Sequence, residues 1–572
     1  MVSIAGSLTR ARSFRHHGLL WLLLAGVSFV IVAPIALLTY NSFNEALPGQ
    51  PFNPGLHHWR EALDDPRLWP ALWNTVRIVF VRMGIGFVVG VLLAWLITRT
   101  NIPHASWLDF GMWLSFFMPG LAVIQGWIFL LEGNTGVVNQ WIVKLPFIDG
   151  SPFNVFSFWG IIWVHLMANV LSTHFVLFSL SFRNMDGALE EAARVAGATG
   201  AGTVRRITLP IMRPILGMVV VLAIIRGMQS FEVERVLGQP IGIDVYATLL
   251  VHMISDEDLI IEQAVVLSVI ILMALVPLIF IQRYYVGNRM YTTVSGKMRP
   301  TTTDLGRWRW PAFAFVVVVI ALLTIVPFIA LIAGSLMTRW GYFDIQNVWT
   351  FSHYSTVLSD SRFLGAFWTT LKLGVISAFV GMAVMFAVAY ALVRSSFRGK
   401  QMLDFVSWLP WALPGVLLSL GILMMVLQIT MLQFLHGTSI ILVVAIILFR
   451  FPIGVHLLRT GIMQVSNELE EAAQISGAKW WYIQFRIVGP ILMPMLLGVG
   501  LITFVATLNE VSGVILLAST ATKTLSLLTL DFLVGAGGSR EAAAVITIVI
   551  MFMAIAAVAI GRRFGLKLAA DR

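Results

Sequence analysis

Long apolar runs are the feature that most restricts the fold of this chain. Each run is about 20 residues long, the length of helix that crosses a hydrocarbon layer of about 30 Å. The composition agrees, because 58% of the 572 residues are hydrophobic and only 12% are charged. Helices satisfy their own backbone hydrogen bonds in lipid, and the runs are too long for barrel strands. The sequence therefore predicts an all-α polytopic membrane protein with about twelve spans, near residues 19–40, 73–98, 107–131, 155–182, 211–231, 264–286, 311–336, 366–393, 403–430, 438–461, 491–518 and 541–563.

A polar segment occurs twice inside this apolar chain. Residues 190–214 and 470–494 align without a gap at an offset of 280, and both begin with Glu-Glu-Ala-Ala. Earlier matches, such as MPG at 118–120 with LPG at 413–415, have an offset of 295. The first half therefore carries 15 extra residues, most simply in the external segment 132–154. These matches predict two parallel six-helix repeats, related by an axis along the membrane normal.

The basic residues predict the orientation and the domain division. Most of the 38 Lys and Arg residues fall in segments on the side of the N-terminus, so that side is cytoplasmic by the positive-inside rule. Both termini and both repeated segments are then cytoplasmic. We expect a first unit at residues 1–290, a basic linker at 291–310 and a second unit at 311–572. The first apolar run, 19–40, is longer than the core of a signal peptide and is expected to be a retained span.

Charge and cysteine content exclude several kinds of function. The net charge of +10 reflects topology, and no nucleic acid is expected as a partner because the basic residues are not gathered in one module. The chain has no cysteine, which excludes disulfides, thiolate metal sites and cysteine nucleophiles. No His spacing typical of a zinc site occurs either. We therefore expect no catalytic residue, and the sequence leaves any metal site unknown.

Each repeated segment has the features of a short capped helix. Asp186 and Ser466 are suitable N-cap residues, and the acidic pairs that follow lie near the positive end of the helix dipole. Gly197 and its counterpart Gly477 supply the position at which each helix stops. Pro210 is placed where the next span begins, because the first helical amides need no partner there.

This pattern resembles the cytoplasmic coupling loop of ABC importer permeases. The resemblance rests on Glu-Ala-Ala, a Gly four residues after the second Ala, and Ile207-Thr208-Leu209-Pro210 between the fourth and fifth spans of a six-span unit. The second copy reads Ile-Val-Gly-Pro at 487–490 and so loses the Leu. The whole chain is similar to a fused, internally duplicated permease of the binding-protein-dependent type I family. Residues 230–238 and 508–512 are most similar to ferric-iron-type permeases, while thiamine, aminoethylphosphonate and polyamine permeases share the architecture.

The resemblance implies a type I ABC importer permease fold and a set of partners in a bacterial inner membrane. The chain has no Gly-x-x-x-x-Gly-Lys-Ser/Thr sequence, so it is expected to bind no cofactor itself and to hydrolyse no ATP. Two copies of a separate ABC ATPase would carry ATP and Mg, and a periplasmic binding protein would deliver the substrate. ATP-driven closure of the ATPases would draw the two loops together and open the pathway outward.

Ten residues of the repeated segments are the candidates for coupling. We expect the acidic side chains to pair with basic groups on the ATPase and the small ones to permit close contact. The alternative is an ordinary capped surface helix. The candidates are Glu190, Glu191, Ala192, Ala193, Gly197, Glu470, Glu471, Ala472, Ala473 and Gly477.

Ionisable residues within the spans are candidates for the translocation pathway, because burying them in lipid is costly. Arg450, in the middle of the tenth span, either lines the pathway or holds two helices together through a carboxylate. Glu232 and Glu510 are expected at matching positions near the external ends of the fifth and eleventh spans. They either pass a ferric ion or another cation, as hard oxygen ligands would, or cap and salt-bridge a helix end. Asn509, Gln229 and Ser230 would add polar lining.

A transporter of another class is the second hypothesis. A secondary transporter or channel would use an ion gradient and would need no repeated docking helix. Its coupling acids should lie at mid-span, where the sequence places no carboxylate. The two repeated segments therefore favour the ATP-driven importer.

Overall fold

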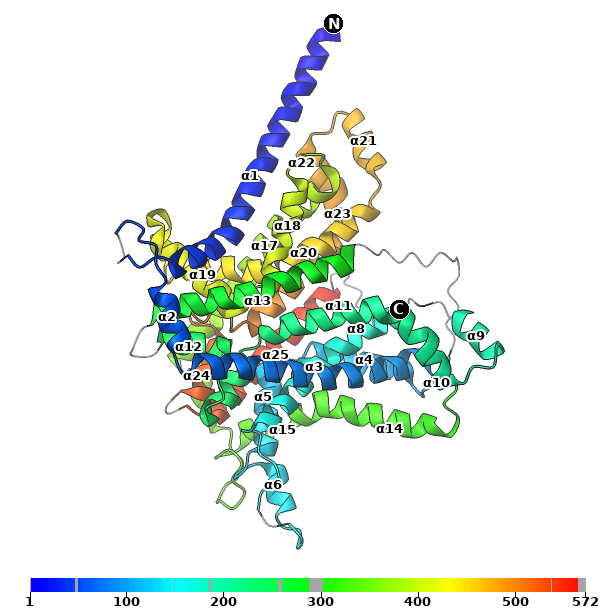
Figure 1. The fold of residues 1–572 in the computed structure, drawn as a ribbon, viewed down its shortest axis with the longest axis vertical. Coiled ribbons are helices and arrows are strands. Elements are labelled where there is room, and N and C mark those ends of the chain that lie inside the picture. The colour runs from blue at the N-terminus through cyan, green and yellow to red at the C-terminus, as the bar shows by residue number, and fades with distance from the viewer. Residues whose placement is uncertain are drawn as a thin grey trace.

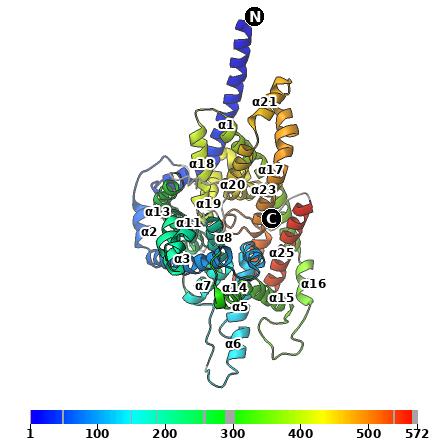
Figure 2. The same ribbon diagram turned by 90° about the vertical axis from the view of Figure 1, so that its right-hand side faces the viewer.

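The computed structural model describes residues 2–46, 50–148, 150–183, 185, 188–255, 260–287, 302–535 and 538–563. Within them the regular structure is helical, and β pairing is limited to isolated bridges such as Thr100 with Thr303. The N-terminal end of the first helix and the α21 region project at one end of the molecule, and α6 projects at the opposite end (Figures 1 and 2).

Nine helical stretches are long and apolar enough to cross a membrane among the described residues. Some of them contain a π-helical turn (η) and so carry two α labels. They are α1 (Val2–Ser42), α3 (Leu68–Arg99), α7 with η1 and α8 (Phe158–Arg183), α13 (Ile261–Gly287), α14 with η6 and α15 (Arg309–Leu336), α17 (Ser361–Arg394), α20 (Ser439–Gln464), α22 with η8 and α23 (Trp480–Asn509), and α25 (Arg540–Arg563).

Bent helix pairs account for the other crossings. Four pairs among the described residues bring the possible total to 13 spans. They are α4 with α5 (Ala105–Phe116, Gly120–Leu131; bent by 97°), α18 with α19 (Lys400–Ala412, Gly415–Gln428; 116°), a pair within α10, η2 and α11 (Gly200–Thr203, Val204–Thr208, Leu209–Met228; 54°), and η3 and η4 with α12 (Glu234–Gly238, Gln239–Ile241, Tyr246–Ser255; 78°). Shorter helices are α2 (His57–Asp64), α6 (Val137–Ile142), α9 (Ala188–Val195), α16 (Ser352–Ser359), α21 (Asn467–Ile475) and α24 (Leu525–Val534).

The all-helical, multi-span prediction is confirmed, and the runs predicted as spans at 107–131 and 403–430 are each a sharply bent helix pair. Each is broken at a Pro-Gly pair, where Pro119 and Pro414 have extended backbone. Proline lacks an amide hydrogen and disfavours helical geometry in the residue before it, so the chain turns at both places. The repeated MPG and LPG tripeptides are thus the corners of two equivalent bends.

The region after the fifth and eleventh spans also differs from the prediction. The eleventh span ends at Asn509, nine residues before its expected end at 518. The predicted spans leave residues 232–263 as a connecting loop, whereas the structure has a bent helix pair there, made of η3, η4 and α12. This pair occupies the position that α24 has in the other half. The amide of Tyr246, at the start of α12, donates to Thr75 Oγ1 on α3 at 3.0 Å, and the amide of Leu525, at the start of α24, donates to Thr370 Oγ1 on α17 at 2.8 Å. Each half therefore anchors a short helix to its second span in the same way.

The first helix of each half packs against the other half. α1 lies against α18 and α19 of the second half as well as α13 of its own, and α15 lies against α5 of the first half as well as α25 of its own. Asn41 of α1 and Gln428 of α19 exchange side-chain hydrogen bonds at 3.1 and 2.8 Å. The packing therefore crosses between the two predicted units; residues 291–301 of the predicted linker lie outside the described residues.

A glycine and a proline meet at the centre of each of these contacts. A Cβ atom added at Gly126 in α5 would lie 2.4 Å from the carbonyl oxygen of Pro327 in α15. A Cβ atom at Gly421 in α19 would lie 2.9 Å from the Cβ of Pro34 in α1. Small residues let transmembrane helices approach closely, and here they do so in both halves.

The extra segment of the first half, within residues 132–154, also joins the two halves. It includes α6, where the second half has only the 3-10 helix η7 (Thr430–Leu435). Glu132 at its start pairs with Arg540 at 2.5 Å, and the Gln140 side chain donates to the Gly341 carbonyl at 2.5 Å. The segment thus fastens the first half to the second at the end where α6 projects.

Candidate functional site

The repeated segments form matching short helices, α9 and α21, at separate places on the edge of the molecule (Figure 1). The Ser466 side chain accepts the Glu468 amide at 3.2 Å, which confirms its N-cap role; Asp186 lies outside the described residues. Gly197 and Gly477 both have φ of 84°, so each is the left-handed residue that ends its helix. The next amide in each copy, at Ala198 and Ala478, donates to the carbonyl five residues back at 2.9 and 3.0 Å. Both helices thus end in a Schellman motif.

The Glu190 side chain does not point outward, although a carboxylate that pairs with a partner protein would do so. Its side chain is buried, with 4% of the residue exposed. Glu190 Oε1 lies 3.6 Å from the guanidinium of Arg99 at the end of α3 and accepts the Thr208 hydroxyl at 2.8 Å. Arg99 also donates to the Met185 carbonyl at 3.3 Å.

Glu470 has the same arrangement in the second half, with 6% of the residue exposed. Its Oε1 accepts Arg394 Nε at 2.8 Å, and its Oε2 accepts the Tyr390 hydroxyl at 2.6 Å. Arg394 also donates to the Val465 carbonyl at 2.6 Å. We call Arg99–Glu190 and Arg394–Glu470 the loop ion pairs. They correct the role expected for Glu190 and Glu470, because a buried carboxylate needs a cationic partner and each finds it within the chain.

The residues that face outward are the next ones along each helix. Glu191, Ala192 and their counterparts Glu471 and Ala472 are exposed, whereas Ala193 is buried and Ala473 half-buried. An apolar residue near the end of each helix is also exposed, and the sequence analysis did not identify it. Val195 is 90% exposed and Ile475 is 88% exposed. The outward face of both helices thus combines a carboxylate, an alanine and a β-branched side chain.

The two repeated segments differ after the glycine. The second copy carries a group of aromatic side chains on its surface, with Trp481 64%, Tyr482 57% and Phe485 71% exposed. The rings of Trp481 and Phe485 stack with centroids 6.0 Å apart. The first copy has Arg205 and Arg206 exposed in this region. Because aromatic and basic side chains suit different surroundings, the two loops are equivalent in their helices only.

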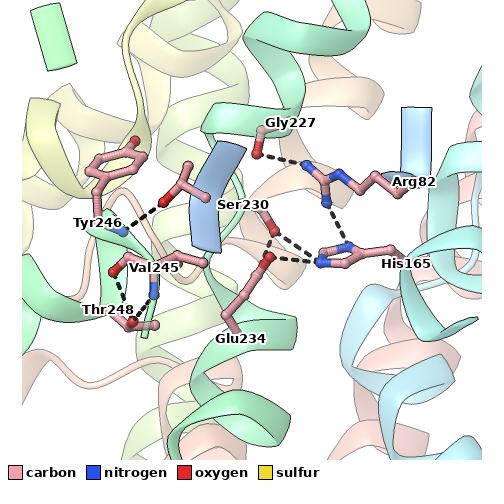
Figure 3. A network of polar contacts seen from close by, with 9 residues as sticks. Arg82, His165, Gly227, Ser230, Glu234, Val245, Tyr246 and Thr248 are labelled. Carbon is pink, nitrogen blue, oxygen red and sulfur yellow. Dashed lines mark hydrogen bonds and ion pairs between the residues drawn. The ribbon is translucent and has the colours of Figure 1, made fainter. Parts of the chain in front are cut away.

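A buried charged network lies at mid-depth in the first half (Figure 3). Arg82, near the middle of the 32-residue helix α3, contacts His165 Nδ1 at 2.7 Å and donates to the Gly227 carbonyl at 2.7 Å. His165 Nε2 lies 2.7 Å from Glu234 Oε1, and the Ser230 hydroxyl donates to Glu234 Oε2 at 2.6 Å. Arg82, His165 and Glu234 are all buried. We call Arg82, His165, Ser230 and Glu234 the Arg82 network.

A second ion pair occupies a comparable depth in the other half. Arg450, near the middle of the 26-residue helix α20, lies 3.1 Å from Glu510 Oε2. Glu510 Oε1 accepts the Gly513 amide at 3.1 Å and the Ser512 hydroxyl at 3.3 Å. Arg450 thus has a carboxylate partner at the end of another helix, α23, and Glu510 both forms this ion pair and accepts local donors.

Glu232 and Glu510 do not align between the halves. At the offset of 280, Glu510 corresponds to Ser230 and Glu232 to Ser512. Both carboxylates lie beside the middles of long helices and not near their ends. Glu232 follows the end of α11, where Gly227 contacts Arg82 in the middle of α3, and Glu510 contacts Arg450 in the middle of α20. They are nevertheless close enough to interact electrostatically with each other and with Arg450.

The remaining polar candidates lie in the same region with local partners. The Gln229 side chain donates to the carbonyl of Trp411 in α18 at 2.8 Å, a contact between the halves. Asn509 donates to the Val505 carbonyl within its own helix at 3.1 Å. Among the described residues, no cluster of three or more His, Asp or Glu side chains could hold a metal ion. The side chains at mid-depth are therefore arranged as ion pairs and hydrogen bonds.

Sequence reasoning missed the partners in this region, Arg82, His165 and Glu234. Arg82 and His165 lie within the predicted spans 73–98 and 155–182, but they are far apart along the chain and belong to different helices. Glu234 lies between the predicted spans 211–231 and 264–286, because the bent pair that contains it is short. A sequence signal did exist, since an Arg and a His within apolar runs both require a buried acceptor.

Comparison with known proteins finds a family model that matches the second half of the chain. Residues 361–565 match the family described as binding-protein-dependent transport system inner membrane component. A putative ferric transport system permease protein, FbpB 1 of Haemophilus influenzae, is 27% identical over 416 residues, which cover 71% of this chain and 63% of that protein. The probable ABC transporter permease protein y4fN of Sinorhizobium fredii is 24% identical over 520 residues, covering 87% of this chain and 88% of that protein.

More distant similarities extend over one half of the chain. The sulfate transport system permease protein CysW of Escherichia coli is 31% identical over 197 residues, which cover 33% of this chain and 62% of that protein. A crystal structure of a bacterial alginate ABC transporter in complex with an alginate pentasaccharide-bound periplasmic protein has a TM-score of 0.42 and 20% identity, covering 49% of this chain and 98% of that one. Over its second half the chain is therefore similar to the membrane permeases of binding-protein-dependent ABC transport systems, and the first half repeats the same features.

Proposed function

We propose that this chain forms the translocation pathway of an ATP-driven importer in a bacterial inner membrane, with both termini in the cytoplasm. Two copies of an ABC ATPase that carry ATP and Mg would bind α9 and α21, and a periplasmic binding protein would deliver a small solute. The chain itself would catalyse no reaction and bind no cofactor. Ferric iron is the proposed solute, since ferric permeases are among the relatives; thiamine, aminoethylphosphonate and polyamines are the alternatives.

The observation that carries this proposal is the matched outward face of α9 and α21. Exposed apolar side chains are common singly, but Val195 and Ile475 occupy the same position in two copies and are both almost fully exposed. Each lies one turn from an exposed carboxylate, Glu191 or Glu471. A helix that carries such a face suits a groove in a partner, where the apolar residue is buried and the carboxylate pairs at the rim.

The loop ion pairs supply the mechanical link between such a partner and the pathway. Arg99 ends α3 and Arg394 ends α17, so a pull on α9 or α21 is applied directly to a helix that crosses the protein. α3 also carries Arg82, which contacts the end of α11 at mid-depth. Movement at the cytoplasmic loop would therefore reach the region of Glu234 and Glu510 through rigid helices.

Reversing the charge of Glu191 and Glu471 together tests this proposal. The variant Glu191→Arg/Glu471→Arg is expected to weaken ATPase association by about tenfold or more, because rim charges at an interface would meet like charges. The measurement is co-purification of the ATPase with the permease and the ATPase activity of the reconstituted complex. The control is Glu61→Arg, which reverses an exposed carboxylate on α2, far from α9 and α21.

A second double variant, Val195→Asp/Ile475→Asp, replaces the apolar part of the face and is expected to have the same effect. Neither pair contributes to a loop ion pair, so the expression and thermal stability of the permease should equal those of the unaltered chain. Normal ATPase association in both double variants would contradict the proposed docking helices.

One observation keeps a secondary transporter as the other candidate. The sequence placed no carboxylate at mid-span, whereas the structure has Glu234 and Glu510 there. Glu234 is held by His165 and Ser230 and Glu510 by Arg450, an arrangement typical of structural contacts as well as of coupling sites. Liposomes that contain the purified chain without an ATPase should show no uptake of ferric citrate under a proton or sodium gradient. Uptake dependent on the gradient would favour the secondary transporter.

A further inference from the structure

We infer that the guanidinium of Arg226 forms an anion-binding subsite between the two units, so that the cargo crosses as an oxygen-rich anion. For a ferric substrate, this means a ferric ion carried with anionic oxygen ligands and not a bare cation. The inference rests on the proposed function, because it names the class of solute that the pathway accepts.

Arg226 lies at mid-depth on the surface where the two halves meet. It belongs to the last turn of α11 and precedes Gly227, whose carbonyl is held by Arg82 from the middle of α3. Its guanidinium lies 5.4 Å from the ring centroid of Trp411 in the second half. Gln229, one turn further, donates to the backbone of the same tryptophan at 2.8 Å. The end of α11 and the end of α18 thus build one small polar surface.

Arg226 has a large accessible surface, although many protein atoms lie around it beyond contact distance. None of the ion pairs found among the described residues includes it. An arginine in a membrane-spanning segment that faced lipid would be costly, so accessible surface at this position indicates a water-filled space. An accessible guanidinium over an aromatic ring retains its hydrogen-bond donors for a ligand.

The neighbouring charges leave Arg226 as the group that is available to a solute. Arg450 and Glu510 interact with Arg226 electrostatically, but they are already paired with each other at 3.1 Å. Both oxygens of Glu510 are used, since Oε1 accepts the Gly513 amide and the Ser512 hydroxyl. Glu232 also interacts with Glu510 and Arg450, so the whole cluster contains two guanidinium groups and two carboxylates, but no carboxylate forms an ion pair with Arg226 among the described residues. The guanidinium of Arg226 is therefore the group that can accept an anion.

The surroundings also fit the geometry of an oxygen-rich anion. The planar guanidinium binds carboxylate or phosphate oxygens in a forked arrangement. Beyond Trp411, the rings of Trp408 and His456 follow at 5.5 and 5.6 Å between successive centroids, which continues the surface along α18 and α20. A polyamine or thiamine cation would meet Arg226 and Arg450 with like charge. The site therefore favours the anionic members among the candidate solutes.

The absence of cysteine permits a direct electrostatic test on the full chain. Gln229→Cys places one thiol beside Arg226. The rate at which this thiol reacts is measured with two methanethiosulfonate reagents, one that carries an anionic sulfonate group and one that carries a cationic trimethylammonium group. Normalised to Met431→Cys, which is 84% exposed on η7, the ratio should favour the anionic reagent by about threefold to tenfold. The preference should disappear with Arg226→Gln, persist with Arg226→Lys and persist with Arg77→Gln, a remote arginine on α3.

Protection of the same thiol tests the class of solute. Ferric citrate should slow the modification of Gln229→Cys by a neutral maleimide at constant ionic strength, and spermidine should not. A preference for the cationic reagent, a preference that survives Arg226→Gln, or protection that spermidine gives and ferric citrate does not would each overturn the subsite. These measurements need no ATPase and no binding protein. The subsite can therefore be contradicted while the docking experiment on α9 and α21 succeeds, and the docking experiment can fail while the subsite is supported.

Discussion

Arg82→Ala is expected to lower the free energy of unfolding by about 3 to 5 kcal/mol, because Glu234 would stay buried without the counter-charge that reaches it through His165. Glu234, which is 1% exposed, and His165 would then remain buried without the guanidinium, and the Gly227 carbonyl would lose its donor. Unfolding of the purified chain in detergent, followed by denaturant titration, measures the change.

Two further variants separate the lost charge from general damage to α3. Arg77→Ala removes an arginine nearer the outer end of the same helix, which contacts the Phe158 ring at 4.2 Å, and should cost only about 0.5 to 1 kcal/mol. Arg82→Met combined with His165→Leu and Glu234→Leu should recover part of the loss, because apolar side chains then replace the whole buried chain of polar contacts. An Arg82→Ala loss no larger than that of Arg77→Ala would show that the Arg82 network contributes little to stability.

Gly126→Ala is expected to cost about 1 to 3 kcal/mol, as overpacking of a tight contact does. The new Cβ would lie 2.4 Å from a backbone oxygen of Pro327, and neither backbone can move without separating α5 from α15. Gly421→Ala should cost less, since its nearest atom, 2.9 Å away, is the Cβ of Pro34. Thermal unfolding monitored by size-exclusion chromatography in detergent would rank the two variants.

Gly120→Ala is the matched control for this series, because it belongs to the same helix as Gly126 and a Cβ there would meet nothing within 4 Å. Its midpoint should equal or exceed that of the unaltered chain, since alanine favours a helix over glycine. If Gly126→Ala were as stable as Gly120→Ala, the close contact between the halves would not be a constraint on the fold.

The sequence was sufficient for the class of fold and for the repeat, because both depend on local properties. Apolar length predicts a span, and the duplicated Glu-Glu-Ala-Ala segment predicts two equivalent helices, down to the left-handed Gly197 and Gly477. The bends were missed because an apolar run has the same composition whether it is straight or folded back. The Pro-Gly pairs at both corners were the available signal.

The candidate site shows a different limit of sequence reasoning. Glu190 and Glu191 are adjacent and chemically identical, but only the three-dimensional structure reveals that one meets Arg99 and the other faces outward. The partners Arg82, His165 and Glu234 lie on separate elements. His165 is 83 positions from Arg82 and 69 positions from Glu234 along the chain. Such contacts depend on helix packing, which hydrophobic periodicity does not specify.

The crossed packing of α1 has a consequence for how the protein is made. Asn41 and its partner Gln428 are separated by 387 positions, so the first helix enters the bilayer long before its contact surface has been translated. At 5 to 20 residues per second, the delay is about 20 to 80 s. During that interval the face around Pro34 has only lipid or an insertion factor against it, and the two halves can close on each other only after the ribosome has passed α19.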